Sequence, residues 1–197
     1  MNDYSLEVKE EELLKEKRTL WDTLVKRGEE IGVEDGAREI VVALNANNLP
    51  TAWSCGGHVD TSIEQTDDYW QRNPWVYFEL CEHHTYPSED SEEGRASAAL
   101  FEVRKGMTTE VPELIEEFYK TRTPQNGVRL MFSKVGGLDY LYRLDAVSDG
   151  PDIITEDCDL SCLNQKLFYQ QEEMRAFAKF LEDRYLSPSR PISHERG

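Results

Sequence analysis

The chain has 197 residues, of which 39% are hydrophobic and 10% aromatic, which suits one domain with a substantial core. Its net charge of −17 argues against nucleic acid as the partner, because binding a phosphate backbone needs clustered lysine and arginine. No stretch approaches the roughly 20 apolar residues of a membrane-spanning helix, and the first residues form no apolar leader. We therefore expect a soluble cytoplasmic protein without a membrane partner.

Two helices are expected at the start of the chain. Apolar residues recur at helical spacing over 6–31 and again over 35–48. Asn47, Asn48 and Pro50 follow the second run and are typical of a helix end.

Two strands are expected next, over 51–56 and 74–82, because both runs are rich in β-branched or aromatic residues. About 17 residues connect them, which is long for a connection inside a compact domain. Long loops of this kind often cover a ligand. Trp70, in this connection, is therefore a candidate stacking surface for a bound ligand.

The middle of the chain predicts two helices and a hairpin. A short helix is expected over 95–105, and Pro112 suits the first turn of the next one. The run 127–146 alternates around Gly136 and Gly137, which favours a hairpin with a two-residue turn. Asp145 falls on the face of the second strand that we expect to be solvated.

A last helix is expected over 161–186, and a tail over 187–197 should be disordered. Asp159 and Ser161 are candidate N-caps for that helix. We predict a single α+β domain over 1–186. It should contain a small, mostly antiparallel sheet of about four strands, with helices packed on one face.

The most informative stretch is TAWSCGGH, residues 51–58. Glycines at 56 and 57 permit a turn and a close approach of backbone to a ligand, and exposed N–H groups there could bind an anion. A thiol at Cys55 beside the imidazole of His58 could also be an activated nucleophile. The alternative is a plain turn, with Cys55 buried as a small apolar residue and His58 in solvent.

A metal site is a further alternative, because Cys81, His83 and His84 follow on the next strand. If the two strands pair in antiparallel fashion, Cys81 lies roughly 20 Å from Cys55 at about 3.3 Å per residue. One zinc ion cannot bridge that distance, so we expect no metal. The four cysteines, including Cys158 and Cys162, are expected to be free thiols.

Charged residues outside this loop give weaker signals. Arg129, on the first strand of the hairpin, could hold a carboxylate or phosphate, or it could pair with an aspartate. The carboxylates at 110, 113, 116 and 117 are more typical of a solvated helix face than of a metal site.

The stretch LNANNLPTAWSCGGH, followed by WVYFEL, resembles a pattern in small uncharacterised bacterial and phage proteins. Their shared loop reads Thr-x-x-Ser-Cys-x-Gly-His, and the resemblance covers most of residues 38–185. It implies that Ser54, Cys55, Gly57 and His58 form the marked loop of that family, and it implies no activity.

A shorter stretch, Ser54–Gly57, is similar to the Ser-Cys-x-Gly stretch of the wybutosine-synthesising tRNA-modifying proteins, which use S-adenosylmethionine. His58 stands where those proteins have arginine.

These signals lead to one expectation about function and two alternatives. We expect a domain that binds a small anionic or nucleotide-like ligand at the loop Ser54–His58. Its site would comprise Ser54, Cys55, Gly56, Gly57, His58, Trp70 and Arg129. The first alternative is an acidic interaction protein without catalysis that binds a basic protein partner. The second is an S-adenosylmethionine-dependent transferase, in which Cys55 and His58 would be the catalytic candidates; no cofactor is specified by the residues themselves.

Overall fold

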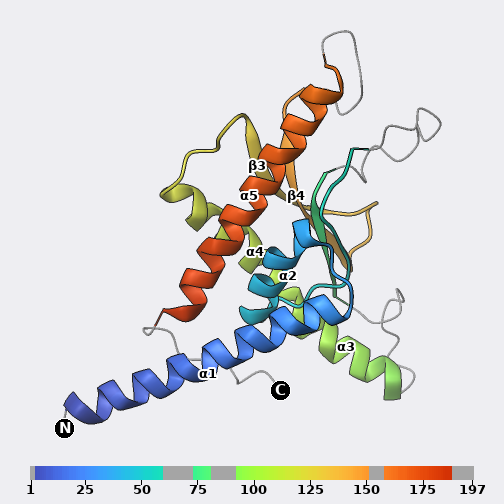
Figure 1. Ribbon diagram of the computed structural model, residues 1–197. Helices are drawn as coiled ribbons and strands as arrows, with labels where there is room; N and C mark the ends of the chain where they lie inside the picture. Colours follow the sequence, from blue (N-terminus) through green and yellow to red (C-terminus); the bar gives the residue numbers. More distant parts are fainter. Residues whose placement is uncertain (1–2, 60–72, 81–91, 151–157, 188–197) are drawn as a thin grey trace.

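The computed structural model describes residues 3–59, 73–80, 92–150 and 158–187 (Figure 1). Trp70, Cys81, His83, His84 and most of the tail lie outside these described residues. None of the helices in the described part of the chain combines the length and the apolar character needed to cross a bilayer.

Helices α1 (Asp3–Glu30) and α2 (Asp35–Ala46) open the chain, close to the ranges that their spacing predicts. Figure 1 shows the N-terminal part of α1 extending beyond the rest of the fold. Its middle is held at the C-terminal end of the last helix, where Trp21 stacks on Tyr185 with 6.2 Å between ring centroids. Lys17 is buried there and donates a hydrogen bond to the carbonyl of Ser187.

Four antiparallel strands form one sheet, as the sequence predicts. They are β1 (Ser54–Cys55), β2 (Trp75–Glu79), β3 (Val128–Lys134) and β4 (Leu141–Ser148), in the spatial order β1-β2-β4-β3. The fold is therefore α+β.

The first strand is shorter than predicted, with two residues instead of six. Ala52 and Trp53 still exchange backbone hydrogen bonds with Tyr77 of β2, so the chain is extended beside the sheet before the regular ladder begins. The hairpin turn is longer than the predicted two residues. Lys134 pairs with Tyr142, and a six-residue loop over 135–140 joins the strands.

The described part of the chain contains three further helices: α3 (Glu92–Lys105), α4 (Met107–Lys120) and α5 (Leu160–Leu186). The predicted place of Pro112 in the first turn of its helix is wrong. The carbonyl of Gly106 accepts hydrogen bonds from the N–H groups of Thr109 and Glu110, so α4 begins earlier and Pro112 falls in its second turn. Asp159 caps α5 by accepting a hydrogen bond from the Cys162 N–H at 2.9 Å.

One face of the sheet and the helices α2, α4 and α5 enclose the core. Side chains from every layer are fully or almost fully buried in it, among them Ile40, Leu44, Val76, Phe78, Leu114, Leu144, Phe177 and Leu181. Figure 1 shows α5 running across the strands with α2 beside it. Helices therefore pack on one face of the sheet, in agreement with the predicted architecture.

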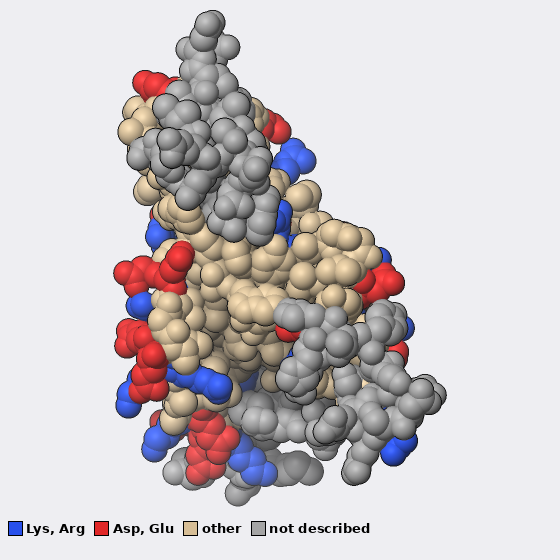
Figure 2. All heavy atoms as spheres, turned by 90° about the vertical axis from the view of Figure 1, so that its right-hand side faces the viewer, with Lys and Arg blue, Asp and Glu red and all other residues tan. Residues whose placement is uncertain are grey.

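The opposite face of the sheet is less solvated than the sequence suggests. Asp145, expected in solvent, has no exposed surface and accepts a hydrogen bond of 2.7 Å from the Arg143 side chain. Trp75 and Met131 are its cross-strand neighbours in the ladder, so large side chains flank it on both sides. Burial raises the pKa of the Asp145 carboxyl, while Arg143 acts in the opposite direction. Figure 2 shows the side of the molecule to the right of α2 and α5, where charged groups gather mainly around an uncharged middle.

The core predicts a large effect for Phe177→Ala. Phe177 has no exposed surface and its ring lies 5.3 Å from that of Phe118, measured between centroids. The substitution should lower the free energy of unfolding by about 3–5 kcal/mol, the usual scale for a buried aromatic. Phe168, on the same helix and 54% exposed, is the matched control, and Phe168→Ala should change stability by less than about 0.5 kcal/mol. Equal effects in urea titrations would contradict this account of the core.

Candidate functional site

The loop Ser54–His58 brings the predicted thiol and imidazole together. The Cys55 sulfur lies 3.8 Å from Nδ1 of His58, and the Gly57 N–H donates to the same sulfur at 3.4 Å. Gly57 has a φ of +77°, which explains why a glycine is needed at this turn. Cys55 is 6% exposed, whereas His58 is in solvent.

The backbone of Gly56 is clamped by side chains from two helices. Its N–H donates to Oε2 of Glu34 at 2.6 Å, and its carbonyl accepts a hydrogen bond from Nε2 of Gln171 at 2.8 Å. Glu34 stands at the N-cap of α2, and its side chain makes no capping bond there because it reaches this loop instead. The Gly56 N–H, which the sequence suggested as an anion-binding group, is therefore already bound to a carboxylate of the same chain.

A close backbone contact completes the clamp. A Cβ atom on Gly36 of α2 would stand 2.7 Å from the Gly56 carbonyl oxygen and 3.0 Å from its Cα. Real Cβ atoms do not approach a backbone oxygen as closely as 2.7 Å, so position 36 requires glycine, and a Cβ at position 56 would be tightly placed at 3.0 Å from the Gly36 Cα. The loop is consequently a packed joint between β1, α2 and α5.

The electrostatics of Cys55 do not suit a nucleophile. Burial is the main reason that the pKa of its thiol is raised above the ordinary value, and the Glu34 carboxylate raises it further. The hydrogen bond from Gly57 has the opposite effect but does not outweigh burial. At neutral pH the sulfur is protonated, whereas activated cysteines carry a thiolate.

The remaining predicted site residues do not join this loop. Arg129 is exposed on β3, three strand spacings from β1, which is roughly 14 Å at about 4.8 Å per spacing. Ser54 lies beside the loop on β1, opposite Val76. Trp70 is outside the described residues, so its predicted stacking role remains a prediction.

The strand register bears directly on the metal hypothesis. β1 and β2 pair in antiparallel fashion with Cys55 opposite Trp75, at the start of β2, which is the geometry assumed in the argument against a shared zinc. Within the described residues no three potential ligands converge on one point. Cys81, His83 and His84 lie outside them.

Two of the four cysteines are not free thiols, contrary to the sequence-based expectation. Cys158 and Cys162 form a disulfide with their Cα atoms 5.3 Å apart, within the usual range for such a bond. Asp159 caps α5, which begins at Leu160. Cys162 is the third residue of the helix, and the first turn brings it back over Cys158.

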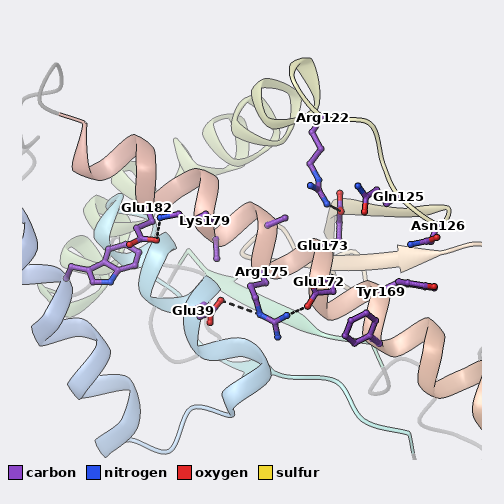
Figure 3. Close-up of a pocket in the computed structure, with 14 residues that line it drawn as sticks. Glu39, Arg122, Gln125, Asn126, Tyr169, Glu172, Glu173, Arg175, Lys179 and Glu182 are labelled. Carbon is purple, nitrogen blue, oxygen red and sulfur yellow. Dashed lines mark hydrogen bonds and ion pairs between the residues drawn. The ribbon is translucent and has the colours of Figure 1, made fainter.

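A groove that the sequence did not reveal runs along α5 (Figure 3). It has a volume of about 600 Å³, in the range of ordinary ligand sites. Trp21 of α1 and Glu39 of α2 line one side, and Arg122, Gln125 and Asn126, which follow α4, line the other. The floor is α5, from Phe168 to Glu182.

A buried carboxylate stands at the centre of this floor. Glu173 is 2% exposed and accepts hydrogen bonds from the Tyr119 hydroxyl and from Nη2 of Arg122, both at 2.8 Å. The Leu130 N–H donates to the Tyr119 oxygen at 2.9 Å, so the network links α4, α5 and β3. Burial, reinforced by the Glu173 carboxylate, raises the pKa of Tyr119, which keeps its hydroxyl protonated as a donor.

Towards solvent, exposed ion pairs line the groove. Arg175 contacts Glu39 of α2 and Glu172 of its own helix, and Lys179 contacts Glu182 at 2.9 Å. Figure 3 shows Arg175 between its two carboxylate partners, bridging α2 and α5. The groove is therefore polar and charged, with aromatic side chains at Trp21, Phe168 and Tyr169.

One weak signal in the sequence pointed to this region. Gln170 and Glu173 fall at positions where helical spacing places the apolar stripe of α5, and both are 2% exposed. A buried charge needs a partner, so Glu173 could have been singled out. Its partners lie more than fifty positions away, and spacing alone does not identify them.

In comparisons with known proteins, no protein-family model, curated protein or solved structure matches the chain. The resemblance of the 51–58 stretch to small bacterial and phage proteins therefore remains a prediction.

The clamp predicts opposite effects for two Gly→Ala substitutions in helices. Gly36→Ala should destabilise the protein by about 1–3 kcal/mol, because the added methyl group must displace the backbone of Gly56. Gly28→Ala, in α1, would meet only the side chains of Arg38 and Val42, at an ordinary 3.5 Å or more, and should stabilise the protein by up to about 1 kcal/mol through helix propensity. Thermal unfolding of both variants measures the difference. A stabilising Gly36→Ala would show that α2 and the loop are not in close contact.

The raised pKa of Cys55 predicts slow thiol chemistry. In the folded protein at pH 8, alkylation of Cys55 by iodoacetamide should be slower than in the urea-unfolded chain by about tenfold or more. The rate should rise with pH only above the ordinary thiol value, because the folded state disfavours the thiolate. Peptide mapping by mass spectrometry assigns the labelled site. His58→Ala should leave the rate unchanged, and a slower reaction in that variant would reinstate His58 as an activating base.

Proposed function

We propose that the protein is a non-catalytic binding domain that receives a basic segment of a partner protein in the groove along α5. The observation that carries this proposal is the groove itself, which combines about 600 Å³ of space, aromatic side chains and an excess of carboxylates. A binding role needs no activated group, and the described residues present none at the Ser54–His58 loop.

The charges of the groove favour a cationic occupant. Its lining includes four carboxylates and three cations, and each cation already has a carboxylate partner. The outer pairs are open to solvent, with the Arg175 side chain 50% and that of Glu39 63% exposed. Such pairs contribute only about 0–1 kcal/mol, so an incoming lysine or arginine can compete for the carboxylates. The net charge of −17 adds long-range attraction for a basic partner.

A second hollow has the same character. It has a volume of about 390 Å³ and lies between α4 and the end of α5. Glu110, Glu113 and Glu117 line it together with Arg184, which contacts Glu117. The carboxylates of α4, expected to form a solvated helix face, thus border a second acidic recess beside the same helix.

The aromatic side chains add contacts that suit long basic side chains. Phe168 is 54% exposed and Trp21 is half-buried at the groove wall. The aliphatic stems of lysine and arginine pack against such rings, and their charged ends interact favourably with the ring faces.

Anion binding at the Ser54–His58 loop is the weaker proposal. An incoming anion would have to displace the Glu34 carboxylate from the Gly56 N–H, and it would do so in a strongly acidic protein. A transferase activity, suggested by the short resemblance to the wybutosine-synthesising proteins, receives no support from the buried, protonated thiol of Cys55.

The groove proposal predicts a site-specific loss of binding. The probe is a fluorescein-labelled eight-residue peptide of alternating lysine and leucine, and fluorescence anisotropy measures its affinity. The double variant Glu39→Gln/Glu172→Gln should weaken binding by about tenfold, equivalent to about 1.4 kcal/mol. Both residues line the groove, and neither contributes to the core.

The matched control changes the same charge elsewhere. Glu10→Gln/Glu12→Gln, on the exposed surface of α1, should alter the affinity by less than about twofold because only screened, long-range attraction is lost. Equal losses in the two double variants would mean that the peptide responds to overall charge and does not occupy the groove.

A further inference from the structure

The disulfide at the start of α5 has an unusual position for a structural bond. Cys158 and Cys162 are four residues apart, so the closed loop spans about one helical turn. The stabilisation that a disulfide gives by restricting the unfolded chain grows with the length of the loop it closes. A bond this short restricts little, and the hydrogen bonds of Asp159 already fix the first turn of the helix.

The same backbone geometry suits the reduced state. Asp159 holds the Cys162 N–H with its side chain and the Leu163 N–H with its carbonyl, and neither bond involves a sulfur atom. Leu163 anchors the turn in the core with 5% exposure. Opening the disulfide therefore requires no refolding of α5.

The two sulfur-bearing residues differ in accessibility. Cys162 is exposed on the first turn of α5, whereas Cys158 is 5% exposed. The Asp159 carboxylate caps this end of the helix, so the difference between the two cysteines comes from exposure and not from the helix dipole. The pair thus joins an exposed residue, which an external thiol meets first, to a buried one.

We propose that Cys158 and Cys162 form a reversible redox pair, with Cys162 as the site at which a small external thiol is attached and released. The thiolate of the small molecule attacks the Cys162 sulfur, a mixed disulfide forms, and the Cys158–Cys162 bond breaks with its electron pair on Cys158, which takes up a proton. A second small thiolate attacks the sulfur of the attached molecule. It releases the Cys162 thiolate and one oxidised small disulfide, so two electrons pass to the protein pair.

The test uses the full chain and glutathione as the probe. The wild-type protein is equilibrated in mixtures of reduced and oxidised glutathione, trapped with N-ethylmaleimide, and mapped by mass spectrometry. The free thiols of Cys158 and Cys162 should appear together as the proportion of reduced glutathione is raised, and they should disappear together as it is lowered. The circular dichroism spectrum should remain that of the folded protein throughout. A pair that stays oxidised in excess reduced glutathione until the protein unfolds would overturn the proposal.

Two single variants test the asymmetry. Cys162 in Cys158→Ser should form a mixed disulfide with oxidised glutathione faster than Cys158 in Cys162→Ser, by about tenfold or more, because Cys162 is exposed and Cys158 is buried. Equal rates in the two folded variants would remove Cys162 as the attachment site.

Discussion

The packing of α5 against α2 and the sheet is the contact on which both candidate sites depend. Its buried stripe, which includes Met174, Phe177 and Leu181, fixes the rotation of the helix over the strands. That rotation places Gln171 on the Gly56 carbonyl and Glu173 under the groove, one on each side of the stripe. A change in the core packing of α5 would therefore alter the glycine loop and the groove together.

Carboxylates serve two distinct purposes in this acidic chain. A few satisfy groups inside the fold: Glu34 holds the Gly56 N–H, Asp159 caps α5, and Glu173 joins Tyr119 to Arg122. Each of these accepts hydrogen bonds, and for the buried Glu173 they offset the cost of removing a charge from water. Many others are exposed, where they attract cations and repel one another. The distinction explains how a chain of charge −17 still forms a compact core.

The parts of the fold that sequence predicts well are those governed by local periodicity. The helix expected over 161–186 and the two strands of the hairpin depend on spacing within one element, and the structure has all three close to their predicted ranges. The predictions that were wrong concern residues whose environment depends on partners distant in sequence. Asp145 is buried because Trp75 and Met131 flank it across two strand pairs. The loop Ser54–His58 was recognised as a glycine turn, but Glu34 and Gln171, which occupy its polar groups, come from positions that no local pattern connects to it.

The docking of α1 on the end of α5 determines the shape of the groove. Lys17 is 2% exposed, and its ammonium group is accommodated because it donates to the Ser187 carbonyl, next to the negative end of the α5 dipole. The ammonium also lies 5.5 Å from the centroid of the Tyr185 ring, on which Trp21 stacks from the same face of α1. Since Trp21 also lines the groove, the buried cation that holds α1 in place also positions one groove wall. The opposite wall is fixed independently, because Arg122 is bound to Glu173 of α5 itself. The two walls are thus anchored at different turns of one helix, at Glu173 and at Tyr185.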